Sequence, residues 1–200
     1  MKIIKIPVGL FQANCYITTL ENGEVYVIDP GGEAEKILSH LNRLDTILLT
    51  HTHFDHIGAL KELKEVYPKA KLCMHENCGY SKEEILAVAK EFSDGLLPLL
   101  KEETDDLPNC DLFLKDKDKI GPFEVIYTPG HSKGSVCYYS KKDDLLFSGD
   151  TLFQGSIGRC DLLGSNFDSI LESLNKILAL PDNTKVLPGH GEATFIKEEK

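Results

Sequence analysis

Three observations predict an α/β domain in which two β-sheets lie between layers of helices. Both halves of the chain begin with short strands and then add helical cover. Polar hairpins at Gly23 and Lys142 indicate antiparallel pairing, which disfavours the alternative of one doubly wound parallel sheet. No linker or shift in composition divides the sequence, so residues 1–200 are predicted to form a single domain.

In the first half, β-branched and aromatic runs predict strands, and apolar residues at helical spacing predict helices. The predicted strands are residues 4–8, 15–18, 24–28, 45–49 and 71–74. The predicted helices are residues 34–41, 57–66 and 82–92. The last of these helices opens with a capping box that starts at Ser81.

The second half begins with residues 91–111, which contain two prolines and no clear period, and which we expect to form a long surface loop with one helical turn. A second meander is then predicted, with strands at residues 111–114, 124–127, 136–139 and 145–147. Ser165 is expected to cap a helix that ends before Pro181, and residues 184–187 form the final predicted strand.

The composition is that of a soluble, acidic, globular protein. The chain has 22 Lys and Arg against 32 Asp and Glu, a net charge of -10, so we expect neither nucleic acid nor an anionic membrane surface as a partner. No apolar run approaches the roughly 20 residues of a membrane span, and no signal peptide is visible. The six cysteines form no C-x-x-C pair, which favours reduced thiols and a cytoplasmic location. The oligomeric state stays open.

The strongest functional signal is the segment that follows the apolar strand ending at Leu49. It reads His51-Thr52-His53-Phe54-Asp55-His56, and it holds three of the seven histidines. If the chain stays extended, His51 and His53 point to the same side of the backbone. A turn after His53 can then bring Asp55 and His56 toward these two imidazoles. Imidazole and carboxylate together suit zinc, iron or manganese. The segment therefore predicts a metal site rather than a strand end with surface histidines.

Three further side chains of this kind follow predicted strands. Each comes directly after a glycine, in Pro129-Gly130-His131, Ser148-Gly149-Asp150 and Pro188-Gly189-His190. Glycine lets the backbone turn and pass close to a site, and loops at strand ends often carry function. The repeated pattern predicts that His131, Asp150 and His190 join the first cluster. Five histidines and two aspartates exceed one tetrahedral metal shell and suit two adjacent metal ions.

The motifs T-H-T-H-F-D-H-I-G, T-P-G-H, F-S-G-D-T-L-F and L-P-G-H-G occur here in this order. The chain thereby resembles the metallo-β-lactamase fold hydrolases, and most closely the short glyoxalase II-like, or hydroxyacylglutathione hydrolase-like, proteins. The resemblance covers nearly the whole chain. It implies a four-layer αββα sandwich in which helices flank two mixed β-sheets.

The resemblance also implies roles for individual residues. The first metal would be held by His51, His53 and His131, and the second by Asp55, His56 and His190. Asp150 would bridge two divalent ions, zinc by preference, with iron or manganese as alternatives. A metal-bound hydroxide would attack a carbonyl carbon, with Asp55 and Asp150 as the catalytic carboxylates. Asp29 would support a ligating histidine from outside the ligand shell, unless it only forms a turn.

For the substrate, the resemblance implies a small-molecule thioester such as a hydroxyacylglutathione. Lys133 and Arg159 are the candidates for holding an anionic group. Full-length glyoxalase II enzymes have a C-terminal helical domain that contributes to glutathione binding, whereas this chain ends ten residues after His190. We therefore expect limited glutathione specificity. The alternatives are a mononuclear iron persulfide dioxygenase, a lactonase or lactamase of the same fold, and a metal-binding module without activity.

Overall fold

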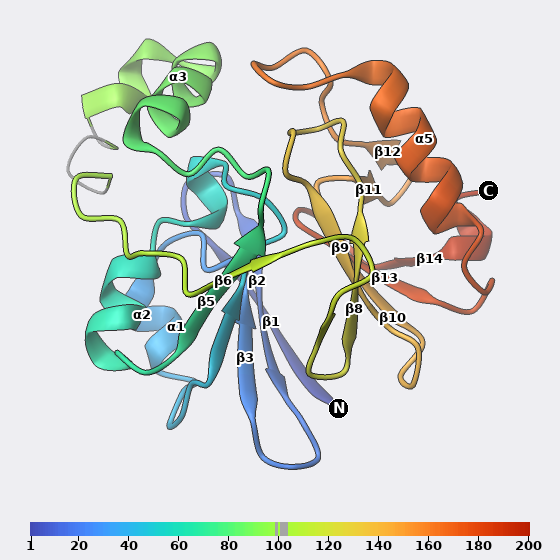
Figure 1. The fold of residues 1–200 in the computed structure, drawn as a ribbon, viewed down its shortest axis with the longest axis horizontal. Helices are drawn as coiled ribbons and strands as arrows, with labels where there is room; N and C mark the ends of the chain where they lie inside the picture. The colour runs from blue at the N-terminus through green and yellow to red at the C-terminus, as the bar shows by residue number, and fades with distance from the viewer. Residues whose placement is uncertain (99, 101–103) are drawn as a thin grey trace.

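Two six-stranded β-sheets pack face to face, and helices cover both outer faces (Figure 1). The computed structural model describes residues 1–98, 100 and 104–200. The four layers follow one another as helix, sheet, sheet and helix, which confirms the predicted αββα sandwich of two mixed sheets. Among the described residues, no helix is long and apolar enough to span a bilayer.

The first sheet contains the strands of the first half of the chain. They are β1 (Lys2–Val8), β2 (Ala13–Thr19), β3 (Val25–Ile28), β4 (Thr46–Leu48), β5 (Lys71–His75) and β6 (Leu112–Leu114), in this spatial order. The pairs β1–β2 and β2–β3 are antiparallel, whereas β3 to β6 run parallel. The parallel part arises because helical segments connect these strands and return the chain to the same edge.

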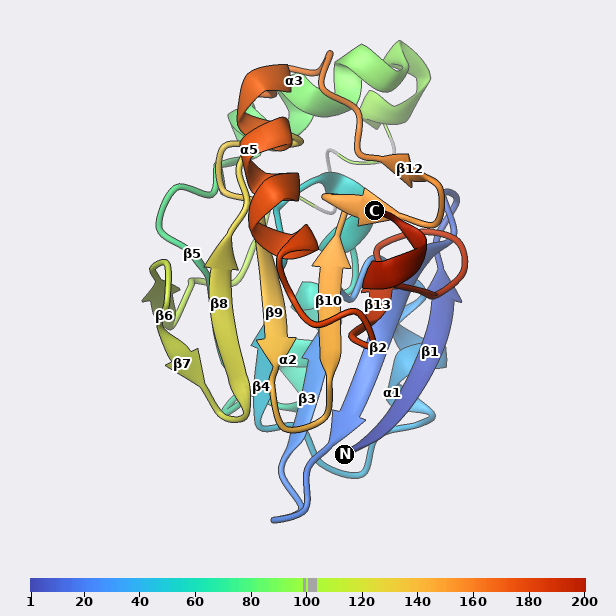
Figure 2. The same ribbon diagram turned by 90° about the vertical axis from the view of Figure 1, so that its right-hand side faces the viewer.

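The second sheet has the spatial order β14-β13-β10-β9-β8-β7 (Figure 2). Its strands are β7 (Lys119–Ile120), β8 (Phe123–Tyr127), β9 (Val136–Ser140), β10 (Leu145–Gly149), β13 (Lys185–Pro188) and β14 (Thr194–Phe195). Within the described chain, only β10 and β13 of this sheet pair in parallel. The short strands β11 (Leu152–Phe153) and β12 (Ser156–Ile157) form a separate ribbon.

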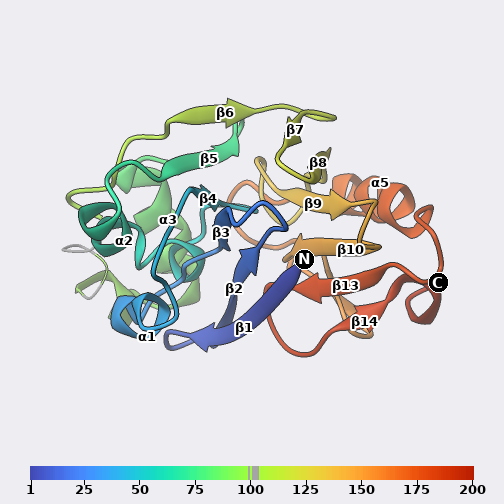
Figure 3. The same ribbon diagram turned by 90° about the horizontal axis from the view of Figure 1, so that it is seen from below.

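The helices lie on opposite sides of the sandwich (Figures 1 and 3). The outer face of the first sheet is covered by α1 (Ala34–Leu38) and α2 (Leu60–Val66), and that of the second by α5 (Phe167–Leu178). Helix α3 (Lys82–Phe92) lies on the same side as α1 and α2 but beyond the ends of the strands (Figure 1). Three 3-10 turns complete the described elements, at Phe54–His56, Asp94–Leu96 and Ile196–Glu198. The Ser81 hydroxyl accepts the Glu84 N–H at the start of α3, as the capping box predicts.

Alternation along the strands builds the core in three layers. Ile47 and Leu49 point to the helices outside the first sheet, whereas Leu48 lies between the two sheets. Tyr138 and Phe147 of the second sheet meet Leu48 in that central layer. A third cluster packs the outer face of the second sheet against α5. The sheets therefore hold their strand ends at fixed positions along one edge, where the functional segments begin.

Two sequence predictions about single elements are wrong. The sequence places the strand at residues 111–114 in the second meander, but β6 pairs in parallel with β5, and the Asp111 carboxylate accepts the Leu72 N–H at 2.8 Å to fix this position. Helix α5 is capped by Asn166 rather than Ser165, because the Asn166 side chain accepts the Ser169 N–H at 2.8 Å. The Ser165 hydroxyl instead donates to the Leu162 carbonyl oxygen.

Residues 91–111 differ in part from the expected surface loop. Leu96 and Leu100 are buried against the helical side of the first sheet. Residues 99 and 101–103 of this segment lie outside the described residues. The predicted helix at residues 57–66 begins only at Leu60, because residues 54–56 form a 3-10 turn. That turn presents Asp55 and His56 toward the edge of the sheet.

Candidate metal centre

The seven predicted ligand residues meet at one edge of the sandwich. Each follows a strand at its carboxyl end: His51 and His53 after β4, His131 after β8, Asp150 after β10 and His190 after β13. Strands β8, β10 and β13 run in the same direction, so their carboxyl ends share this edge. Asp55 and His56 reach the same place from the 3-10 turn that follows β4.

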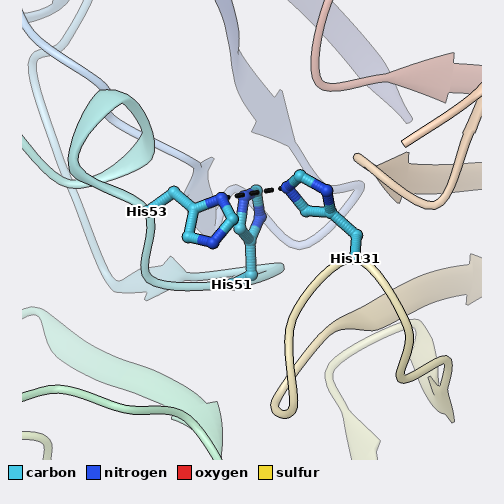
Figure 4. Close-up of side chains that lie close together, drawn as sticks. All are labelled: His51, His53 and His131. Carbon is cyan, nitrogen blue, oxygen red and sulfur yellow. Dashed lines mark hydrogen bonds between the residues drawn. The ribbon is translucent and has the colours of Figure 1, made fainter. Parts of the chain in front are cut away.

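One group of side chains consists of His51, His53 and His131 (Figure 4). Their ring nitrogens lie within 4.8 Å of one another, and all three residues are buried. The shortest separation, 2.9 Å, joins His53 Nδ1 to His131 Nε2. Three imidazoles from two distant segments therefore face a common point.

The second group consists of Asp55, His56 and His190. His190 Nε2 lies 3.3 Å from Asp55 Oδ2, and His56 Nε2 lies 3.9 Å from the same oxygen. Asp150 lies between the two groups, because its carboxylate oxygens are 3.5 Å from the Nε2 atoms of His56 and His190 and also 3.5 Å from that of His131. One carboxylate thus touches both groups.

Hydrogen bonds to backbone carbonyls fix the orientation of two imidazoles. His131 Nδ1 donates to the Arg159 carbonyl oxygen at 2.9 Å, and His190 Nδ1 donates to that of Phe11 at 3.1 Å. A carbonyl oxygen only accepts, so each of these rings, when neutral, turns the lone pair of Nε2 toward the cluster. Such partners are typical of metal-binding histidines.

Asp29 and Thr50 orient two other imidazoles. Asp29 Oδ2 lies 3.1 Å from His56 Nδ1 and accepts the Thr50 hydroxyl at 2.6 Å. Because that hydroxyl donates to Asp29, its oxygen can accept from His51 Nδ1, which is 3.1 Å away. The Nε2 lone pairs of His51 and His56 are thereby also directed at the cluster.

Several buried polar atoms of the cluster have no hydrogen-bond partner within the described part of the chain. They include His51 Nε2, His56 Nε2 and Asp150 Oδ1. Leaving a buried polar atom unpaired costs about 1–3 kcal/mol. A cation would satisfy these atoms together, and the imidazole and carboxylate donors suit zinc, iron or manganese. The residues present therefore fit divalent metal ions.

The charge states of the cluster also favour a cation. Burial lowers the pKa of His51 and His53, and the neighbouring histidines lower it further. Burial disfavours a charged His56, but the carboxylates of Asp150, Asp55 and Asp29 outweigh it and raise its pKa to about 10. In the metal-free protein, a proton on His56 therefore takes part of the role of a cation among these carboxylates.

Two glycines allow the close approach of the segments. Gly149 has a φ of 49°, in the left-handed region, and a Cβ there would meet the Thr50 hydroxyl oxygen at 2.4 Å. At Gly189, a Cβ would meet Asp150 Oδ1 at 2.1 Å and His56 Cε1 at 2.9 Å. The glycines that precede Asp150 and His190 are thus required for space as well as for the turn.

Sequence reasoning missed an aromatic contact that joins the loops around the cluster. The Phe92 ring, at the end of α3, packs edge-on against Phe11 and Phe54, with centroids 5.9 and 5.4 Å apart. The Arg159 guanidinium lies 5.0 Å from the centre of the same ring. Phe11 and Arg159 are the residues whose carbonyl oxygens orient the imidazoles at positions 190 and 131. Phe92 therefore supports the loops behind both groups, and no local sequence signal indicates this contact.

The two predicted anion-binding residues have different surroundings. The Arg159 guanidinium makes paired hydrogen bonds to Asp161 at 2.9 and 3.0 Å, so its charge is already compensated. Among the described residues, no ion pair joins Lys133 to an acidic side chain, and the stem of Lys133 lies along Gly164. Of the two residues, Lys133 is the cation that remains available beside the cluster.

The sandwich of helix, sheet, sheet and helix carries a cluster of histidines and aspartates at the ends of its strands. This combination defines the class of metallo-hydrolases. The chain belongs to the metallo-beta-lactamase superfamily, whose family model matches residues 8–190. It is 42% identical to the probable metallo-hydrolase YqgX of Bacillus subtilis, over 100% of this chain and 95% of that protein. It is 33% identical to the hydroxyacylglutathione hydrolase GloC of Haemophilus influenzae, over 100% of this chain and 95% of that protein.

A solved structure gives the same fold. The protein TTHA1623, crystallised in a di-iron-bound form, superposes with a TM-score of 0.86 at 33% identity, covering 98% of this chain and 96% of that one. The agreement extends over nearly the full length of both chains. The fold and the superfamily are therefore established, and a site for divalent metal fits both.

Proposed function

We propose that this protein is a dinuclear, metal-dependent hydrolase that cleaves small thioesters of the hydroxyacylglutathione type. The observation that carries the proposal is the position of Asp150, 3.5 Å from histidine nitrogens of both groups. A carboxylate shared in this way suits two adjacent cations. One ion would be held by His51, His53 and His131, and the other by Asp55, His56 and His190.

Divalent cations bound there would acidify a water molecule and polarise the carbonyl oxygen of a substrate. The chain supplies the positions of both ions through the hydrogen bonds from His131, His190, His56 and His51 to fixed partners. Asp55 and Asp150 supply carboxylates that can accept a proton at the reacting centre. Zinc is the proposed metal; the di-iron form of TTHA1623 makes iron a direct competitor in the test.

The cysteines support a mechanism without a protein nucleophile. Burial raises the pKa of all six thiols, to about 12 for Cys73 and Cys78. A thiol in this state is a poor nucleophile near neutral pH, because the reactive form is the thiolate. Replacing all six cysteines should therefore leave appreciable turnover if the chain still folds.

The thioester substrate is proposed from the similarity to GloC and from the free cation beside the cluster. GloC is named a hydroxyacylglutathione hydrolase, and it matches this chain along its whole length. Lys133 can attract an anionic group of a substrate whose carbonyl lies at the metal ions. An exposed charge pair contributes at most about 1 kcal/mol, so we expect a high Michaelis constant and modest dependence on the thiol half.

The test is a substrate panel on metal-free protein reconstituted with zinc, iron or manganese. S-lactoylglutathione should be hydrolysed, and a chelator should abolish the activity reversibly. Asp150→Ala should lose activity by several orders of magnitude, whereas His40→Ala, an exposed histidine on the helical side, should behave as wild type. A β-lactam, a lactone and, under air, glutathione persulfide complete the panel. Turnover of one of these without thioester cleavage would reject the proposed substrate class.

A further inference from the structure

A pocket of about 190 Å³ opens beside the first group of histidines. Its lining includes Thr52 and His53, which follow β4, and Ile85 and Val88 of α3. The loop that follows His131 also lines the pocket, as do Leu163 and its neighbour Gly164. A substrate whose carbonyl lies at the metal centre can therefore extend an arm into this space.

Hydrogen bonds fix the walls of the pocket without a ligand. The Leu163 N–H donates to the Glu91 carboxylate at 2.6 Å and ties that wall to α3. The Thr52 hydroxyl donates to the Gly79 carbonyl oxygen at 2.7 Å. The Cys78 thiol donates to the Gly134 carbonyl oxygen at 3.4 Å, which fixes the loop that follows His131. A preformed pocket binds an arm with little ordering cost.

The pocket carries one charge of each sign. Lys133 supplies the ammonium, and Glu84, in the first turn of α3, supplies a carboxylate. The Glu84 carboxylate accepts the Ser81 hydroxyl at 2.9 Å, which holds the side chain in place while leaving its charge uncompensated by any cation among the described contacts. Apolar side chains from α3 lie beside both charges. The complementary ligand is therefore an arm that carries both a carboxylate and an amino group on a short carbon skeleton.

We propose that this pocket binds the thiol half of the substrate, and that this half is an amino-acid-type thiol whose carboxylate pairs with Lys133 and whose ammonium pairs with Glu84. The proposal rests on the proposed thioester hydrolysis, because it assigns the arm that leaves with the sulfur. A hydroxyacyl group is short and stays at the metal centre. The longer thiol half is the part that needs a second pocket.

Unreactive thioethers test the pocket by binding alone. The probe is S-methylcysteine, with N-acetyl-S-methylcysteine lacking the ammonium and S-methylcysteine amide lacking the carboxylate. Their dissociation constants would be measured by NMR titration of the zinc-loaded protein and again of the metal-free protein. Each lost charge pair should weaken binding up to about fivefold, because the pairs are partly exposed.

The decisive comparison combines probes and variants. In Glu84→Gln, N-acetylation should no longer weaken binding, and in Lys133→Met, amidation should no longer weaken it. The glutamine side chain preserves the capping box, and the methionine keeps most of the apolar stem of lysine. Glu83→Gln, in the same helical turn, and Lys141→Met, in a distant hairpin, are the matched controls and should behave as wild type.

Equal penalties in wild type and variants would overturn the proposal, because they would place the charge recognition elsewhere, including at the zinc ion itself. Equal binding of all three probes to the wild type would also overturn it. S-lactoylglutathione hydrolysis is measured on the same samples. A protein that shows the expected binding pattern but no hydrolysis keeps the pocket and rejects the thioesterase function, so the two failures are distinguishable.

Discussion

Asp29 Oδ2 lies 3.1 Å from His56 Nδ1, and the same carboxylate accepts the hydroxyl of Thr50, the residue next to His51. Asp29 is buried at the end of β3, and its φ of 50° places it in the left-handed region. A turn-forming role alone would not direct its carboxylate at a histidine. This single side chain therefore contacts His56 directly and His51 through Thr50, and so orients one imidazole of each candidate group.

Asp29→Asn should weaken metal binding at both groups. Asp29 Oδ1 accepts the Thr50 backbone N–H at 2.8 Å, whereas Oδ2 meets His56 Nδ1 and the Thr50 hydroxyl. An amide has one acceptor oxygen, so its NH2 group would face the donors at one of these two positions. Loss of such an orienting partner typically costs 10–100-fold in metal affinity. Competition with a chromophoric chelator measures the effect. Asp45→Asn removes another hydrogen-bonded carboxylate far from the cluster, and equal metal affinity in the two variants would contradict the assignment.

Phe92→Ala should lower metal affinity although Phe92 supplies no ligand. Its ring supports Phe11 and Arg159, whose carbonyl oxygens orient His190 and His131. Truncation removes support from both loops, and because the ring is only partly buried it should cost less than the about 3–5 kcal/mol of a fully buried phenylalanine. Phe92→Leu should restore most of the metal affinity.

The control for this substitution is Phe113→Ala, which truncates an exposed ring. Chelator competition gives the metal affinity of each variant, and chemical denaturation gives its stability. A Phe92→Ala protein that is less stable but binds metal as tightly as wild type would refute the link.

Gly189→Ala should disrupt metal binding at both groups. The added methyl group would lie 2.1 Å from Asp150 Oδ1, which forces that carboxylate away from its position between the histidines. We expect activity to fall by at least about 100-fold with little change in the rest of the fold. Gly95→Ala meets only the Ser93 hydroxyl at 3.4 Å and serves as the control. Normal metal content in Gly189→Ala would show that Asp150 is not held at this point.

Metal binding should release protons and should strengthen as the pH rises. Carboxylates raise the pKa of His56 to about 10 in the metal-free protein, so this imidazole is protonated at pH 7 and must lose its proton to bind a cation. Affinity should therefore increase with pH until the pH passes that pKa. Calorimetric titration at pH 7 in buffers of different ionisation enthalpy counts the protons released. Release of none would contradict the charge state assigned to His56.

The folding stability of the metal-free protein should change with pH in the direction opposite to metal affinity. It should fall as the pH rises, because protonated His56 stabilises the folded state. Because the folded pKa of His56 lies above that of the unfolded chain, protonation stabilises the metal-free protein fully below about pH 6.5. That contribution disappears as the pH rises through about 10. His56→Ala should remove this part of the pH dependence of unfolding, which chemical denaturation at several pH values measures.

The sequence predicts the candidate ligands because each lies next to a local signal. His51 and His53 follow an apolar strand, and His131, Asp150 and His190 each follow a glycine at a strand end. Their convergence follows once parallel strands present their carboxyl ends at one edge. Runs of apolar and β-branched residues also predict most strands of both sheets, because strands such as β3, β4 and β9 are buried on both faces.

The sequence does not predict contacts between side chains that are distant along the chain. Nothing near Phe92 indicates that its ring meets Phe11 and Arg159, and nothing near Arg159 indicates that Asp161 compensates its charge. The local sequence also does not indicate that β6 pairs with β5, because a strand of three apolar residues could belong to either sheet. These features depend on packing of complete layers rather than on local pattern.

The number of metal ions per active chain tests the central claim most directly. Elemental analysis of the protein, reconstituted to full thioesterase activity, should give about two divalent ions per chain. His190→Ala should reduce this to about one and should remove most of the activity, because only the second group loses a ligand. One tightly bound iron in the fully active protein, unchanged in His190→Ala, would contradict the dinuclear account.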